Sequence, residues 1–116
     1  MTFRAPQMLH VVTFSLAFGM ATPLAAAAQD AKKGAEVYAA QKCSVCHSIA
    51  GKGGKQSPLD GVGKKLSADD IKLWIVNPKE AATKFKSTKK PPMPAKYSAL
   101  PAADLDALVA YMVSLK

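Results

Sequence analysis

The sequence predicts an all-α domain over residues 29–116, with three to five helices. Three observations support this class. Apolar residues recur at helical spacing near the C-terminus, capping residues precede two other helix-favouring segments, and no segment alternates apolar and polar residues as a half-buried strand does. A domain of 88 residues is rarely stable without a disulfide, a metal or a bound group that completes its core. The sequence therefore predicts a small helical domain with such a staple.

The first 28 residues are predicted to be a secretory signal peptide. Arg4 supplies the positive charge, an apolar stretch follows, and Pro23 precedes an alanine run that offers a cleavage site after Ala28. The alternative is an uncleaved anchor, because the leader approaches the ~20 residues of a membrane span. Pro23 and the small residues favour cleavage. We expect an exported, periplasmic domain over residues 29–116 that retains no membrane span.

Two helices are predicted to begin at capping residues. Asp30 caps a helix over residues 31–42, a stretch rich in Ala, Lys and Glu. Ser67, followed three residues later by Asp70, resembles a capping arrangement. It predicts a helix through residue 76, ended by the Asn-Pro pair that follows.

Glycines and prolines delimit the remaining segments. Residues 51–65 are glycine-rich and predicted to be a loop, whereas residues 79–86 form a turn or a short helix. Residues 89–94 contain three prolines and cannot form a regular helix. Pro101 begins a final helix that runs to the C-terminus. Its apolar stripe consists of Leu105, Leu108, Val109, Met112 and Leu115.

Cys43, Cys46 and His47 form a C-x-x-C-H motif, the attachment signature of c-type haem. Two thiols at this spacing can add to the two vinyl groups on one porphyrin edge, and the adjacent histidine reaches the iron from one face. A structural zinc site has four ligands, and these three are the only Cys or His residues after the leader, so a zinc site is disfavoured. A thioredoxin-like pair lacks its βαβ pattern here, and a disulfide would close only a very small loop. Covalent haem is favoured, and it would be the staple that the domain needs.

Met93 is the predicted second iron ligand. A methionine usually fills gaps in a core, and Met112 fits that role within the C-terminal stripe. Met93 lies instead between Pro92 and Pro94, where no apolar periodicity exists and a rigid loop can present one thioether. Met112, a lysine and an open sixth position remain alternatives. Met/His ligation raises the reduction potential relative to harder ligands, which suits the high-potential end of a respiratory chain.

With these features the mature sequence resembles the class I (mitochondrial-type) monohaem cytochromes c of the bacterial periplasm. The resemblance covers residues 29–116 and rests on motifs that occur in the family's order. These are Gly34-x-x-x-Tyr38, Cys43-x-x-Cys46-His47, Pro58-Leu59-x-Gly61-Val62-Gly63, Leu73-Trp74-Ile75-x-Asn77-Pro78, Pro92-Met93-Pro94 and Leu108-Val109-Ala110-Tyr111-Met112.

The resemblance implies a small cytochrome c fold around one covalently attached haem, with the N- and C-terminal helices crossing near Gly34. Tyr38 would pack by Leu108 and Tyr111. Tyr38 and Cys43 are five positions apart, where four is commoner in the family.

The resemblance also implies two further haem-binding residues. The Pro58 carbonyl would accept the Nδ1–H of His47 and so set its tautomer and basicity. Trp74 would lie near the haem, where its indole N–H could be donated to a propionate.

The function implied by the resemblance is electron transfer rather than enzyme catalysis, because a six-coordinate iron has no position for a substrate. The protein would be a diffusible carrier or the cytochrome subunit of a redox enzyme. The alternatives are a haem enzyme or gas sensor with an open distal site, and a disulfide-containing domain without haem. A peroxidase is disfavoured because the mature chain has no distal histidine or arginine.

The charge of the mature chain predicts its partners. Fifteen lysines against eight acidic residues give a net charge of +7, which favours redox proteins with acidic docking surfaces. Nucleic acid is disfavoured by export and by the absence of arginine, the preferred base reader. A monomer is favoured. The lysines near the expected haem edge are Lys52, Lys55, Lys84, Lys86, Lys89, Lys90 and Lys96.

Overall fold

The computed structural model describes residue 19 and residues 22–116. Most of the predicted signal peptide lies outside these residues, so the boundary at residue 28 stays a prediction. Within the described part of the chain, no helix is both long and apolar enough to cross a membrane.

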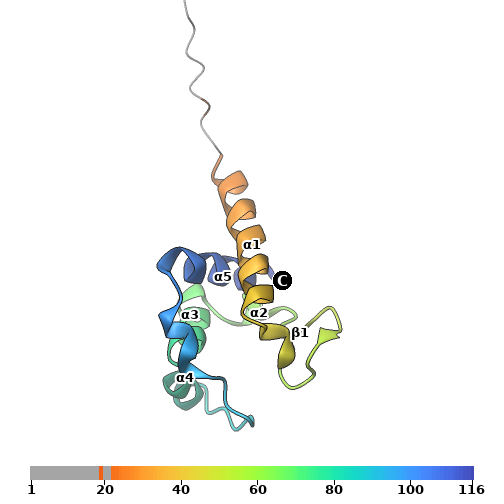
Figure 1. Cartoon of the computed structure of the whole chain (residues 1–116), viewed down its shortest axis with the longest axis vertical. Coiled ribbons are helices and arrows are strands. Elements are labelled where there is room, and N and C mark those ends of the chain that lie inside the picture. The colour runs from red at the N-terminus through yellow and green to blue at the C-terminus, as the bar shows by residue number, and fades with distance from the viewer. Residues whose placement is uncertain (1–18, 20–21) are drawn as a thin grey trace, which may run out of the picture.

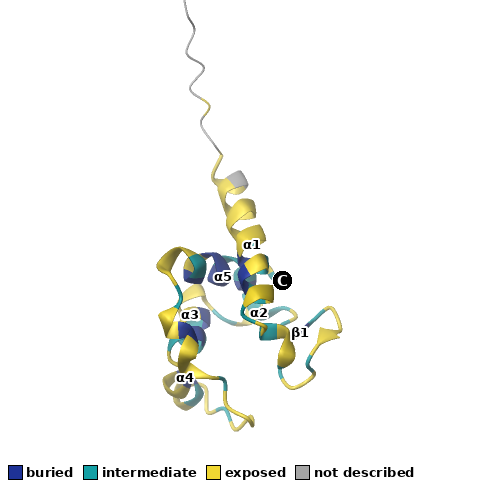
Figure 2. Cartoon of the chain, viewed as in Figure 1, coloured by how far each residue is buried: buried dark blue, intermediate teal, exposed yellow. Residues whose placement is uncertain are grey.

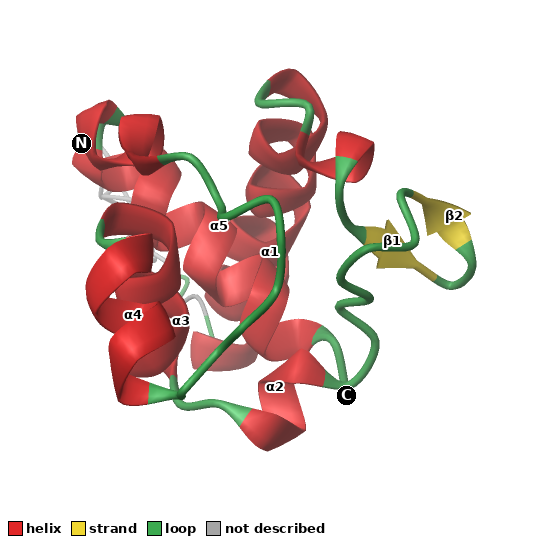
Figure 3. Cartoon of the chain, turned by 90° about the horizontal axis from the view of Figure 1, so that it is seen from below, coloured by secondary structure: helices red, strands yellow, loops and turns green. Residues whose placement is uncertain are grey.

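The described residues form a mostly helical domain, which confirms the predicted all-α class (Figure 1). A small two-stranded hairpin is the only sheet in this part of the chain, and it lies to one side of the helices (Figure 3). The elements are α1 (Pro23–Ala40), the 3-10 turn η1 (Cys43–Val45), β1 (Ser48–Ile49), β2 (Lys52–Gly53), α2 (Val62–Lys65), α3 (Ala68–Val76), α4 (Pro78–Lys84), the 3-10 turn η2 (Ala95–Ala99) and α5 (Ala102–Ser114).

Helices α1 and α5 cross at Gly34, as the resemblance implied. A Cβ at Gly34 would overlap the carbonyl oxygen of Ala107 and lie 2.5 Å from the Cβ of Tyr111. Only glycine allows the two backbones to approach this closely. One turn along α1, the rings of Tyr38 and Tyr111 meet edge to face, with centroids 5.8 Å apart.

The core lies between α1, α3, α5 and η2, where the buried positions gather (Figure 2). Met112 is buried in it, in agreement with its predicted packing role. The buried cluster consists of Val37, Ile71, Ile75, Tyr97, Leu105, Leu108, Val109 and Met112.

The first helix begins earlier than predicted, at Pro23 instead of residue 31. Asp30 therefore lies inside α1 and does not cap it. The alanine-rich segment after Pro23 favours helix, and proline is well suited to a first helical position. The additional residue between Tyr38 and Cys43 is accommodated after α1 ends, where Lys42 takes a left-handed conformation with φ of 56°.

The predicted cap of α3 and its predicted end at Asn77-Pro78 are confirmed. The Ser67 hydroxyl accepts a hydrogen bond from the Asp70 backbone N–H at 3.1 Å. Asn77 ends α3 and caps the next helix, because its side-chain oxygen accepts from the Glu80 N–H at 3.3 Å. The Asn77-Pro78 pair thus separates two consecutive helices that pack together.

The prediction that residues 51–65 form a loop throughout is wrong, because this range contains β2 and α2. β1 and β2 pair across a turn in which Ala50 and Gly51 both have positive φ, and such turns suit tight hairpins. The short α2 packs against the end of α5, where the Gly63 N–H donates to the Leu115 carbonyl at 2.8 Å. The position of α2 therefore depends on a contact with a distant part of the chain, which local composition does not encode.

Candidate haem-binding site

The C-x-x-C-H motif forms one compact turn at the end of α1. The backbone N–H groups of Cys46 and His47 both donate to the Cys43 carbonyl, at 3.3 and 3.0 Å. Cys43, Cys46 and His47 are half-buried, and the two thiols are not joined in a disulfide. A single turn therefore holds the two nucleophiles and the imidazole that haem attachment requires.

Neighbouring segments hold this turn through its backbone carbonyls. Gly53 and Gly54 lie so close to the motif backbone that a Cβ on either would overlap it. The donors to the carbonyls are the Gly54 N–H to Ser44 at 2.8 Å, the Ser57 N–H to Cys46 at 3.2 Å, and the Tyr38 hydroxyl to His47 at 3.3 Å. The hairpin and α1 thus fix the position of the motif.

His47 is oriented by Ser57, and the prediction that the Pro58 carbonyl would do so is wrong by one residue. The Nδ1 atom of His47 lies 2.8 Å from the Ser57 carbonyl oxygen. Ser57 is held beside the ring because its own N–H already bonds the Cys46 carbonyl, whereas Pro58 is exposed. Sequence reasoning missed Ser57. Its available signal was the position before a proline, which disfavours helical backbone.

This hydrogen bond determines which imidazole nitrogen is available. A carbonyl oxygen only accepts, so Nδ1 carries the proton and donates it. The Nε2 lone pair of His47 is then free for iron, and the bond to Ser57 fixes the orientation of the ring.

Charged and titratable groups of the motif and of the segment around η2 influence one another. Burial raises the pKa of the Cys43 thiol above its usual value, although Lys96 favours the thiolate. Burial also raises the pKa of Tyr97, and the nearby Cys43 and Cys46 raise it further. Tyr97 and Lys96, in the segment that follows Met93, are therefore close enough to the attachment turn for their charges to interact with it.

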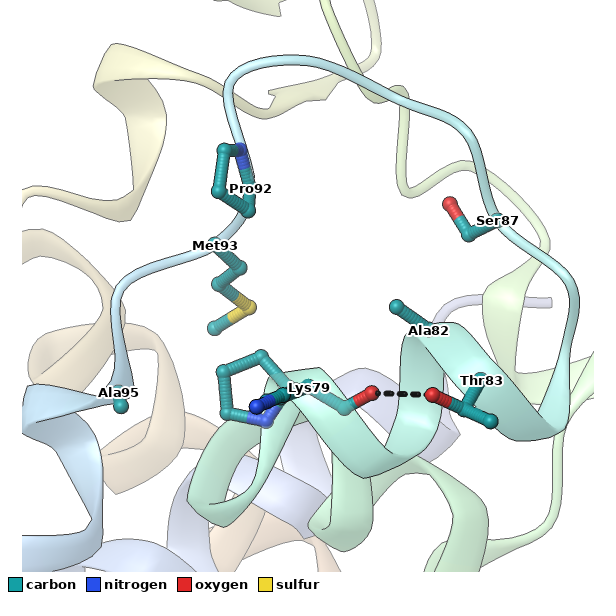
Figure 4. Close-up of a pocket in the computed structure, with 8 residues that line it drawn as sticks. Lys79, Ala82, Thr83, Ser87, Pro92, Met93 and Ala95 are labelled. Atoms are coloured by element: carbon teal, nitrogen blue, oxygen red, sulfur yellow. Dashed lines mark hydrogen bonds between the residues drawn. The ribbon is translucent and has the colours of Figure 1, made fainter.

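Met93 lines a cavity of about 490 Å³ between α4 and the loop that follows it. Its side chain extends from the loop towards α4, and Pro92 precedes it on the same wall (Figure 4). Met93 is half-buried and packs against the core cluster. The other lining residues are Pro78, Lys79, Ala82, Thr83, Ser87 and Ala95.

Trp74 lies on α3, half-buried, with its indole stacked on Phe85 at a centroid distance of 5.9 Å. The Nζ atom of Lys84 lies over the Phe85 ring, 5.3 Å from the ring centroid. The predicted hydrogen bond from Trp74 to a propionate stays a prediction.

The packing of the domain fits a large apolar group. No large side chain in the described part of the chain is less than 2 % exposed. In a protein core of native density, large apolar side chains are normally enclosed on all sides. Two thiols and one imidazole nitrogen lie together in the attachment turn, which is what covalent attachment of a c-type haem requires. The residues present therefore fit the group.

Among the described residues, no group of three or more His, Cys, Asp or Glu side chains could hold a metal ion by itself.

A small helical domain built around a C-x-x-C-H turn defines a c-type cytochrome. The family model for cytochrome c matches residues 31–116, and the chain belongs to this family. It is a class I c-type cytochrome that carries covalently attached haem c, and Cys43 and Cys46 fit the attachment. Electron transfer through haem is the function that the family implies. Neither the curated proteins nor the solved structures contain a match to this chain.

Proposed function

We propose that this cytochrome is a periplasmic electron-transfer protein whose haem iron is ligated by His47 and Met93. It carries one electron, performs no enzymatic reaction, and acts as a diffusible carrier or as the cytochrome subunit of a redox enzyme. The observation that carries this proposal is Met93, a thioether held at a cavity by a proline-bounded loop.

The haem supplies a one-electron Fe(III)/Fe(II) couple, and the protein controls how that couple behaves. Ser57 holds the His47 ring through Nδ1, so the imidazole presents Nε2 in a fixed orientation. Met93 offers a soft sulfur donor, which favours Fe(II) and raises the reduction potential. If His47 and Met93 both held the iron, they would leave no place on it for a small molecule, and the haem would supply one-electron exchange only.

Replacement of Met93 by alanine tests the ligation. We expect Met93→Ala to lose the sulfur–iron charge-transfer band, to bind cyanide or carbon monoxide readily, and to have a lower reduction potential. Met112→Leu is the matched control, because it changes a buried methionine with nearly constant volume. An intact band in Met93→Ala would refute the assignment. Rapid carbon monoxide binding by the unaltered ferrous protein would instead favour a gas sensor with an open distal site.

The partners in this proposal are redox proteins with acidic docking surfaces. Lys79 lines the cavity beside Met93, and Lys84, Lys86, Lys90 and Lys96 are exposed on α4, its loop and η2. Such a cationic face raises encounter rates with an acidic partner by up to ~10–10³ at low salt.

The docking test measures electron transfer to an acidic redox protein as ionic strength rises. The Lys86→Glu, Lys90→Glu double variant should be slow at low salt. Lys32→Glu is the control, because Lys32 lies on α1 and not on α4, its loop or η2. Figure 1 shows α1 and α4 as separate parts of the fold. A flat salt dependence, or equal effects of the variants, would make these lysines solubility residues only.

A further inference from the structure

One side-chain hydrogen bond connects the loop that carries Met93 to the loop that orients His47. The Nζ of Lys89 donates to the Gln56 carbonyl at 3.1 Å, across 33 positions of sequence. Gln56 immediately precedes Ser57, whose carbonyl accepts from His47. The two segments next to the proposed axial ligands are therefore joined directly.

The Gln56 end of this bond is firmly held. Its neighbour Ser57 bonds Cys46 through its backbone N–H at 3.2 Å and His47 through its carbonyl at 2.8 Å. A group tied to Gln56 is thus tied to the attachment turn.

The Met93 end has few other restraints. Proline has no N–H, so residues 91, 92 and 94 cannot donate backbone hydrogen bonds. For the described residues, the one backbone hydrogen bond found within residues 88–94 is a long contact from the Lys89 N–H to the Ser87 hydroxyl at 3.5 Å. Ser87 itself is anchored to α4, because its N–H donates to the Ala82 carbonyl at 2.9 Å. Between Ser87 and Met93, the bond from the Lys89 side chain therefore adds to the stiffness of the prolines and to the packing of Met93 against the core.

We propose that Lys89 is a positioning residue that fastens the Met93 loop over the cavity that Met93 lines. The bond to Gln56 keeps Met93 near the iron and slows the loop opening that lets external ligands enter. This inference rests on the proposed ligation by Met93. Lys89 does not touch the reacting atoms and acts through the loop alone.

Lys90 provides a matched control for Lys89. It is the next residue, it is exposed, and its side chain forms no hydrogen bond or ion pair with the described residues. Lys89→Met and Lys90→Met remove the same charge from the same loop, and methionine retains most of the length of the lysine side chain. A difference between the two variants therefore reports the bond to Gln56.

The test is the rate at which cyanide or imidazole binds the ferric holoprotein, since binding requires displacement of Met93. Loss of one net hydrogen bond should accelerate binding by roughly tenfold in Lys89→Met. Lys90→Met should bind at the unaltered rate, and Lys89→Arg, which retains a cationic donor, should restore much of the restraint. The guanidinium denaturation midpoint of Lys89→Met should change little, because opening of the loop is local.

Equal rates in Lys89→Met and Lys90→Met would overturn the positioning role, whether both stay at the unaltered value or both rise through the shared loss of charge. A charge-transfer band that survives in Met93→Ala would overturn the ligation itself. The two failures are therefore separate observations on separate variants.

Discussion

Substitution of Gly34 by alanine tests the contact on which the two terminal helices depend. Inside a helix, alanine is favoured over glycine by roughly 1 kcal/mol, so an exposed site would gain stability. At Gly34 the new methyl would overlap the Ala107 carbonyl and lie 2.5 Å from the Tyr111 Cβ. Both obstacles belong to the backbone or are fixed directly to it, so no rotamer change relieves them. The helices must separate.

The cost of that separation exceeds the gain. An overfilled core contact costs about 1–3 kcal/mol, and a gap of 0.5–1 Å forfeits a quarter to a half of the dispersion energy along the interface. We expect Gly34→Ala to lower the free energy of unfolding by about 1 kcal/mol after the helix-propensity gain is included.

Guanidinium denaturation of the ferric holoprotein, followed by far-UV circular dichroism, measures this change. Ala39→Gly is the control on the same helix, because Ala39 is exposed and its substitution reports helix propensity alone, about 1 kcal/mol. A Gly34→Ala protein as stable as the unaltered one, or more stable, would refute the close approach of α1 and α5.

Three further predictions follow from the caps, the charges and the leader. Ser67→Ala should cost about 1 kcal/mol of stability in the same denaturation assay, because the Asp70 N–H loses its acceptor. The hydrogen bond from Lys84, 2.6 Å from the Asp70 carboxylate, holds the pKa of that carboxyl below its usual value. Its stabilising contribution is therefore present above about pH 4 and lost as the pH falls through the lowered pKa; an NMR titration of Asp70 in Lys84→Ala should show the pKa return upward. Intact-mass measurement of exported protein should give a chain that begins at Gln29, and retention of the first 28 residues would indicate an anchored cytochrome.

The sequence predicted correctly those helix boundaries that capping residues and prolines determine. Ser67 caps α3 and Asn77-Pro78 ends it, because caps and prolines act within one turn of the chain. Four residues of the predicted stripe, Leu105, Leu108, Val109 and Met112, are buried on α5, whereas Leu115 is half-buried and follows the end of the helix. The beginning of α1 was misplaced, since an alanine-rich segment next to a capping residue supports either start.

The parts of the site that involve distant segments were predicted less well. The C-x-x-C-H motif identified the attachment turn because its chemistry is contained in five consecutive residues. The acceptor for His47 was misplaced from Ser57 to Pro58, because a shift of one residue in a loop leaves the motif unchanged. Lys89 was noted only as a surface charge, and its bond to Gln56 has no signature in sequence because it depends on where two loops meet.

The contact between Gly34 and Ala107 has a consequence for how the chain reaches its native state. The two residues are some seventy positions apart, and pairing α1 with α5 closes a loop that contains every other element from η1 to η2. The entropic cost of closing a loop rises only slowly with loop length. The chain must nevertheless meet this cost before the contact between the helices provides any stabilisation. The helix pair should therefore form as one unit in the rate-limiting step, and a cut in an exposed loop between them should leave two fragments that remain associated through their ends.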